Sequence, residues 1–220
     1  MNYLSVDVEE DFPPHMGTLN GVEGLRKIAG LLAEHNSEAT FFITAEILDE
    51  LPDIADIVRG HEVGCHGLRH IDYSRMPKER FEEETLKAID TLNSHGLEPV
   101  GFRAPYASIN GGMLEVVGRH FRYDSSKRFY NPRPAGVREI PIYAGGKAFG
   151  INPIIFNIIR SAPIRCKVYF IHPWEYGGLD FNKISSRRRG MRLLGYSSGN
   201  YVENLAGLLK EGCVSISNLL

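Results

Sequence analysis

Short apolar segments alternate with longer amphipathic segments from residue 3 to residue 126 of this chain. The short segments have the length of buried strands, and the longer ones repeat apolar residues at helical spacing. Such alternation predicts an α/β fold with a parallel sheet or barrel, whose functional side chains lie at the carboxyl ends of the strands. The expected strands are 3–8, 39–44, a segment ending at Cys65, 99–103 and a segment ending at 123–126, and the expected helices are 21–35, 45–58 with a break near Pro52, 78–95 closed by Gly96, and one from about 111.

The pattern becomes less regular after residue 126. The expected strands there are 137–142, 166–172 and 213–217, and the expected helices are 150–160 and 200–211. Neither a linker-like tract nor a block of charge divides residues 1–220, so the sequence predicts a single domain with one core.

Composition limits the classes of partner. A net charge of -2 and 43% hydrophobic residues are typical of a globular protein and give no overall attraction to nucleic acid. No apolar run reaches the roughly 18 residues that a membrane span needs. The first residues lack the pattern of a secretion signal, which predicts a cytoplasmic location. Three cysteines in apolar surroundings, Cys65, Cys166 and Cys213, are expected to be buried thiols rather than disulfides or metal ligands.

Histidines follow the strand that ends at Cys65. Gly64 and Gly67 are expected to let the chain turn there. If a helical turn follows, His66 and His70 lie four residues apart on one face, and both imidazoles can reach one metal ion. Taken alone, the pair fits ordinary surface or core histidines equally well.

Carboxylates follow the first strand. Period-two alternation places Asp7 and Glu9 on one face of the strand, and Val8 on the other. A solvated acidic loop is the common alternative for such a run. Against that alternative, Asp7 lies inside the strand pattern, where an unpaired carboxylate would be costly.

The strand ends together supply the groups that amide hydrolysis requires. A catalytic zinc site has three protein ligands and one open position, and His66, His70 and one acid from residues 7–11 would provide the ligands. A second carboxylate could then take a proton from water, and the distant His172 could protonate a leaving amine.

Five short motifs, in this order, resemble those of the polysaccharide deacetylase family, also called the NodB-homology or carbohydrate esterase family 4 enzymes. They are Ser5–Glu9, His66–His70, Arg103–Tyr106, Tyr123–Ser126 and His172–Trp174. The resemblance implies a distorted (β/α) barrel, TIM-like and seven-stranded, and one divalent metal ion, usually zinc, with cobalt or nickel as alternatives.

The resemblance also implies roles for individual residues. Asp7 matches the general base, His66 and His70 match metal ligands, and Arg103 matches the residue that orients the base. Tyr106 would offer its backbone N–H to the oxyanion.

Four further positions match the remaining motifs. Asp124 matches the acid that steadies the catalytic histidine, and His172 matches the general acid. Trp174 would line the pocket for the acetyl methyl group, and Pro105 is expected to contact the substrate beside it.

One position departs from the commoner family motif, in which a second aspartate follows the first and binds the metal. Val8 stands there in this chain, as in a variant whose third ligand lies two residues after the base. Glu9 is therefore the favoured ligand, with Glu10 or Asp11 as alternatives.

The resemblance leaves the substrate open. It favours a metal-dependent N-deacetylase of an acetylated amino sugar or glycan precursor, free, nucleotide-linked or lipid-linked. The alternatives are a deformylase, a cyclic-imide or allantoin-type hydrolase, and a non-catalytic glycan-binding module. A cluster of Arg187, Arg188, Arg189 and Arg192 is expected to be a solvated loop, with phosphate binding as the alternative. The oligomeric state is not predicted.

Overall fold

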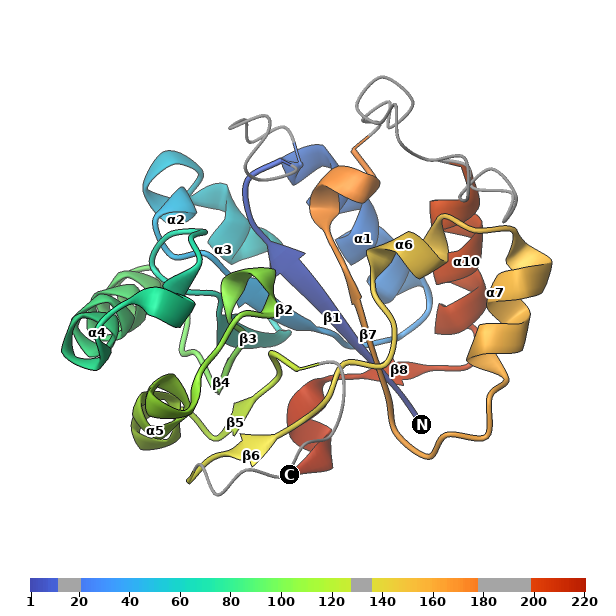
Figure 1. Ribbon diagram of the computed structural model, residues 1–220. Coiled ribbons are helices and arrows are strands. Elements are labelled where there is room, and N and C mark those ends of the chain that lie inside the picture. Colours follow the sequence, from blue (N-terminus) through green and yellow to red (C-terminus); the bar gives the residue numbers. More distant parts are fainter. Residues whose placement is uncertain (12–20, 128–135, 178–198) are drawn as a thin grey trace, which may run out of the picture.

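The computed structural model describes residues 1–11, 21–127, 136–177 and 199–220 (Figure 1). Seven strands form one curved sheet in the order β6-β5-β4-β3-β2-β1-β7, and β8 pairs with the start of β1. All of the pairs between these strands are parallel. The strands are β1 Asn2–Val8, β2 Thr40–Ile43, β3 Glu62–Cys65, β4 Gly101–Phe102, β5 Tyr123–Asp124, β6 Arg138–Glu139, β7 Lys167–Ile171 and β8 Cys213–Val214.

Helices surround the curved sheet (Figure 1). The α-helices are α1 Val22–Glu34, α2 Ile47–Glu50, α3 Asp53–Ile57, α4 Lys78–Ser94, α5 Gly111–His120, α6 Gly146–Phe149, α7 Pro153–Arg160 and α10 Gly199–Leu209. Single 3₁₀ turns are η1 Tyr73–Arg75, η2 Pro105–Ala107, η3 Pro173–Glu175 and η4 Ile216–Leu219. The distorted (β/α) barrel predicted from the sequence is thereby confirmed.

Buried apolar side chains explain why these elements form where they do. Every residue of β1 is buried, because this strand has β2 on one side and β7 on the other. On α1, Leu25, Ile28 and Leu32 are fully buried at the spacing of one helix face. Each such side chain contributes roughly 1.5–3 kcal/mol of hydrophobic stabilisation. The sheet and the helices thus share one core.

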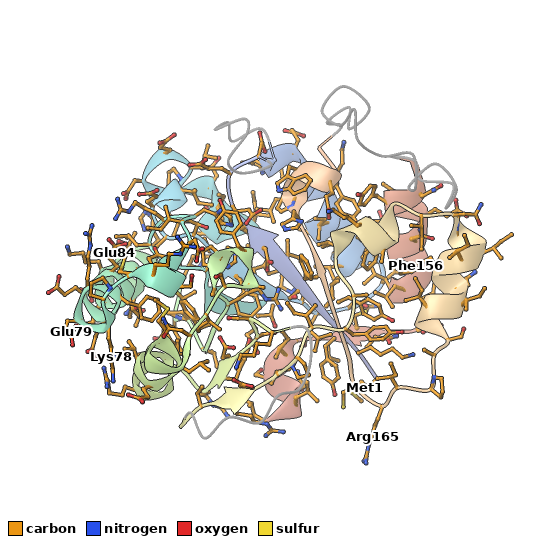
Figure 2. All side chains as sticks on the ribbon, in the orientation of Figure 1. Met1, Lys78, Glu79, Glu84, Phe156 and Arg165 are labelled. Carbon is orange, nitrogen blue, oxygen red and sulfur yellow. The ribbon has the colours of Figure 1, made fainter. Side chains whose placement is uncertain are left out.

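The polar face of an amphipathic helix is visible on α4. Lys78 and Glu79 lie at the outer edge of the molecule (Figure 2), while Phe81 and Leu92 of the same helix are buried. Gly96 follows the helix with φ of 74°, as predicted for the residue that closes it. None of the described helices is both long and apolar enough to cross a membrane.

Several predicted boundaries differ from the structure. The predicted helix 45–58 is divided at Pro52, as expected, into α2 and α3. The predicted helix 150–160 is α7, which begins at Pro153 after the capping side chain of Asn152, and the short α6 lies before the predicted range. The predicted strand 213–217 ends after two residues and becomes η4. Cys166 is exposed, unlike Cys65 and Cys213, because it lies just before β7 begins.

Gly64 does not turn the chain, contrary to the prediction. It lies within β3, and a Cβ atom there would come within 2.4 Å of the Phe42 ring on β2. Glycine at this position therefore leaves room for an aromatic side chain inside the barrel. The turn occurs at Gly67, whose φ of 86° is left-handed.

Candidate metal centre and active site

A cavity of about 540 Å³ lies where β1, β3 and β7 end. Because these strands are parallel, the residues that follow them meet at one edge of the sheet. With the exception of Asp124, the polar residues predicted from the strand ends are brought together there. The cavity is lined by Asp7, Glu9, His66, His70, Arg103 and His172, among others.

Glu9, His66 and His70 form a compact cluster in this cavity. Their ligand atoms all lie within 4.8 Å of one another. Oε2 of Glu9 is 2.6 Å from Nε2 of His70 and 3.3 Å from Nε2 of His66. Burial by itself would raise the pKa of Glu9, but His172, His66 and His70 hold that pKa well below its usual value. Glu9 is therefore an ionised carboxylate facing two imidazoles.

The alternative acids are placed elsewhere. Oδ1 of Asp11 accepts a hydrogen bond of 2.7 Å from the backbone N–H of Gly21, which anchors the start of α1. Glu9, rather than Glu10 or Asp11, is thus the acid that joins the two histidines.

A backbone contact sets the protonation of His66. Nδ1 of His66 lies 2.8 Å from the carbonyl oxygen of Arg103, and a carbonyl can only accept. Nδ1 therefore holds a proton, which leaves Nε2, 3.3 Å from Glu9, as the ring nitrogen that could bind a metal. Hydrogen bonding of this kind to the second nitrogen is characteristic of metal-ligating histidines.

These residues fit a divalent metal. Two histidines and one carboxylate are a ligand set of catalytic zinc sites. Ligands about 2 Å from a tetrahedral ion are about 3.3 Å apart. Glu9 and His66 are at that distance, whereas Glu9 and His70 are 2.6 Å apart. Unlike Nδ1 of His66, Nδ1 of His70 is buried and has no hydrogen-bond partner among the described residues. The cluster can therefore hold one metal ion, and its geometry does not select the element.

The loop that carries His70 is held by contacts outside the cavity. Residues 66–70 are not helical, contrary to the conditional prediction from their spacing. Instead, Nη2 of Arg69 donates to Glu84 of α4 at 2.5 Å, and the Tyr73 hydroxyl contacts both the N–H and the carbonyl of Arg69 at 3.1 Å and 3.0 Å. The two histidines meet through this loop geometry rather than through a shared helix face.

Asp7 and Arg103 form a buried ion pair beside the cluster. Nη1 of Arg103 is 2.6 Å from Oδ1 of Asp7, and the guanidinium lies 4.2 Å from the centre of the Phe42 ring. Ser5 and Ser125 accept further hydrogen bonds from Arg103. Among the described residues, Asp7 has no other hydrogen bond, so its second oxygen is available to the cavity.

His172 follows β7 and faces the cluster from the opposite side. Its Nε2 is 3.5 Å from Oε1 of Glu9, and its ring stacks on Trp174 with the centroids 4.6 Å apart. Burial would lower the pKa of His172, but the carboxylates of Glu9 and Glu175 outweigh that effect and raise the pKa to about 9. His172 is therefore protonated at neutral pH and faces the cavity as an acid.

The family model for polysaccharide deacetylases matches residues 11–120, which is half of this chain. The chain belongs to the polysaccharide deacetylase family. The matched span contains His66, His70 and Arg103, whereas Asp7, Glu9 and His172 lie outside it. Those three residues line the same cavity as the three matched ones.

Curated relatives cover part of this deacetylase-family chain. A peptidoglycan deacetylase of Helicobacter pylori is 27% identical over 135 residues, which are 59% of this chain and 46% of that protein. A peptidoglycan-N-acetylglucosamine deacetylase of Bacillus cereus is 30% identical over 92 residues, which are 40% of this chain and 34% of that protein. The chain thus spans less than half the length of these relatives.

Solved structures share the fold over the whole chain. A Mycobacterium smegmatis protein, provisionally named a polysaccharide deacetylase, has a TM-score of 0.72 at 19% identity and covers 99% of this chain and 87% of its own. A carbohydrate esterase family 4 pseudoenzyme from Bacillus anthracis has a TM-score of 0.66 at 16% identity and covers 100% of this chain and 64% of its own. At these identities the likeness shows the fold.

Asp124 has a different environment from the one that the family resemblance implies. Its carboxylate accepts hydrogen bonds from the hydroxyl and the N–H of Ser126, at 2.6 Å and 3.1 Å. The Ser126 hydroxyl in turn accepts from the N–H of Ala104 at 2.8 Å. Asp124 is buried and does not line the cavity. It therefore supports the loop before Tyr106, and the carboxylate beside His172 belongs to Glu175.

The burial of Asp124 predicts a pH dependence of stability. Burial raises the pKa of Asp124 from 3.8 to about 6, although the Ser126 hydrogen bonds oppose the shift. Between these values the folded chain holds a proton that the unfolded chain has lost. The free energy of unfolding should therefore fall by about 2 kcal/mol as the pH rises from 4 to 7.

Replacing Asp124 with asparagine should remove this contribution to the pH dependence of the free energy of unfolding. Urea unfolding of both proteins at pH 4, 5, 6 and 7 measures it, and the difference between the two stability profiles cancels the other titrating groups. Parallel profiles would show that Asp124 titrates alike in the folded and unfolded chains.

Of the two residues predicted to contact the substrate, one lines the cavity and the other does not. Trp174 lines the cavity, and its Nε1 donates to Oε1 of Glu9 at 3.4 Å. Pro105 is buried in η2 and does not line the cavity, so the structure does not support its predicted contact with substrate. Tyr106 does line the cavity, with φ of 58° and its ring 4.6 Å from that of His70.

Glu175 is the site residue that the sequence did not single out. It lines the cavity beside His172, one residue after the His172–Trp174 motif. Its position three residues after His172 was an available signal, because i and i+3 side chains meet in a tight turn. The predicted arginine cluster at residues 187–192 lies outside the described residues.

Proposed function

We propose that this chain is a metal-dependent hydrolase that removes the N-acetyl group from an acetylated amino sugar. The observation behind the proposal is that one cavity contains the Glu9, His66 and His70 cluster together with Asp7 and His172. Membership of the polysaccharide deacetylase family and the names of the peptidoglycan deacetylase relatives support the acetylated sugar as the substrate class. Zinc is the proposed metal because the ligand set suits it.

The proposed roles of Asp7 and Arg103 follow from their ion pair. When bound, a divalent metal would polarise the acyl carbonyl and make a water molecule more acidic. Asp7 accepts the proton from that water as it attacks the acyl carbon. Arg103 occupies one oxygen of Asp7, which orients the carboxylate and keeps it ionised until the proton arrives. The backbone N–H of Tyr106 is proposed as a donor to the developing oxyanion.

His172 completes the reaction from the other side of the cavity. The bond between the acyl carbon and the sugar nitrogen breaks when the nitrogen receives the proton on Nε2 of His172. The products are acetate and a free amine, so the atoms and the charge balance. Stacking on Trp174 fixes the imidazole ring, and the indole is proposed to form the wall against the acetyl methyl group.

Metal content and amine release test this proposal together. Elemental analysis of the purified protein should give near one metal ion per chain. Amine release from a panel of chitooligosaccharides should stop on chelation and return on addition of zinc. The physical reason is that the acyl carbonyl loses its polarising partner when the cluster is emptied.

Other outcomes lead to other conclusions. Turnover of formylated sugars or cyclic imides, without amine release from acetylated sugars, would contradict the substrate class and favour the sister hydrolases. Failure to bind zinc, cobalt or nickel would contradict the catalytic proposal itself. The carrier of the sugar, whether free, lipid-linked or polymeric, would follow from the relative kcat/KM values on each form.

A further inference from the structure

The carboxylate of Glu175 contacts His172 at two points. Oε2 accepts a hydrogen bond of 2.9 Å from the backbone N–H of His172, and Oε1 lies 3.4 Å from Nδ1 of its ring. That nitrogen is buried and has no hydrogen bond among the described residues. The distance of 3.4 Å is longer than an ideal hydrogen bond, as is common for catalytic contacts before substrate binds.

We infer that Glu175, rather than Asp124, is the carboxylate that positions His172 for proton transfer. It keeps a proton on Nδ1, so that Nε2 is the nitrogen that faces the cavity and exchanges a proton with the leaving group. Nε2 does face the cavity, because it lies 3.5 Å from Glu9, one of the candidate metal ligands. This inference rests on the proposed function, since it assigns a role within that reaction.

The surroundings of Glu175 fix its carboxylate in place. Glu175 is 5% exposed and ends the turn η3. A Cβ atom added to Gly146, the first residue of α6, would lie only 2.0 Å from Oε1 and 2.2 Å from Oε2. The turn itself is held against α1, where a Cβ atom on Gly24 would lie 1.8 Å from the carbonyl oxygen of Pro173. The carboxylate of Glu175 therefore occupies space that is open because residue 146 is a glycine.

A glutamine at position 175 could not reproduce both contacts. The backbone N–H of His172 can only donate, so it requires the amide oxygen of the glutamine. The amide NH₂ would then face Nδ1, which must give up its proton in order to accept. The neutral ring would carry its proton on Nε2, the opposite of the tautomer that Glu175 favours. A wrong tautomer impairs proton transfer even when the geometry is intact.

Kinetics of Glu175→Gln provide the first test, on whichever amide the wild-type protein cleaves. We expect kcat to fall by about 10- to 100-fold, the cost typical of removing the carboxylate partner of a metal-binding histidine, with KM within about threefold. Asp124→Asn should lower kcat less than Glu175→Gln. The reverse order, with Glu175→Gln unchanged, would overturn the inference and return the role to Asp124.

Gly146→Ala provides a second test that keeps the carboxylate but displaces it. Gly146 does not have a left-handed φ, so alanine suits its backbone. We expect a fall in kcat in the same direction as for Glu175→Gln. The matched control is Gly111→Ala at the first residue of α5, where an added Cβ would meet nothing within 4 Å; its kcat should equal that of the wild type.

Nuclear magnetic resonance of the histidine rings gives a result that does not depend on activity. Long-range ¹H–¹⁵N spectra of ¹⁵N-histidine-labelled protein, with the His172 signals assigned from His172→Gln, report which ring nitrogen is protonated. When the ring is neutral, Nδ1 should be protonated in the wild type and unprotonated in Glu175→Gln. Identical His172 spectra in the two proteins would overturn the inference. A wild-type protein that cleaves no amide would contradict the proposed function. The spectra would still show whether Glu175 keeps a proton on Nδ1 of His172.

Discussion

Replacement of Asp7 by asparagine is expected to lower kcat for amide hydrolysis by roughly 10²- to 10⁴-fold while the protein keeps its metal. The amide has nearly the same shape as the carboxylate and can still accept from Arg103. It cannot take a proton from water, so the reaction would lose its base. Steady-state amine release and elemental analysis of the same preparation measure the two effects separately.

The ion pair with Arg103 requires a stability control for this variant. Arg103 is 1% exposed, and removing one partner of a buried ion pair costs about 3–5 kcal/mol. Asparagine retains one acceptor, and Ser5 and Ser125 also accept from the guanidinium, so a smaller loss is expected. Urea unfolding measures it. Asp53→Asn is a suitable comparison, because Asp53 is exposed and only weakly paired.

An unchanged rate for a folded, metal-loaded Asp7→Asn protein would remove Asp7 from the role of base. A rate that falls together with the metal content would instead assign Asp7 to the metal site. The contact distances favour Asp7 as the base, because Asp7 is paired with Arg103, whereas the candidate metal ligands are Glu9 and the two histidines.

The edge of the sheet that bears the site could be predicted from the sequence. Asp7, His66 and Arg103 each end a short apolar strand, and parallel strands bring their carboxyl ends together whatever the detailed packing. The choice of Glu9 followed from the period of the strand, which places it on the face of Asp7. These predictions depend on local patterns and on the direction of the chain.

Contacts between distant segments could not be predicted in the same way. The carboxylate beside His172 is Glu175, and it is kept there by Gly146 of α6 and by the packing of η3 on α1. Gly64 was expected to form a turn because glycine commonly does so. Its actual role is to make room for Phe42, a residue of the neighbouring strand. Such roles are defined by the partner, which no local pattern identifies.

Replacement of His66 by alanine is expected to weaken zinc binding by more than about 100-fold. Loss of a residue that only supports a metal ligand typically costs 10- to 100-fold in affinity, and His66 is proposed as a ligand itself. The substitution leaves His70 and Glu9, which are too few to enclose a catalytic zinc ion. Competition with a chelator of known affinity measures the dissociation constant, and elemental analysis measures the stoichiometry.

His95→Ala is the matched control for this measurement. His95 caps the end of α4 and its Nδ1 contacts the carbonyl of Thr91 at 3.0 Å, so its removal should leave zinc binding unchanged. His66 is 2% exposed and its Nδ1 contacts the carbonyl of Arg103, so alanine also leaves a buried gap, and the metal-free variant must be shown to fold. A folded His66→Ala protein with full zinc affinity would exclude His66 as a ligand. Another residue of the cavity would then have to complete the ligand set with Glu9 and His70.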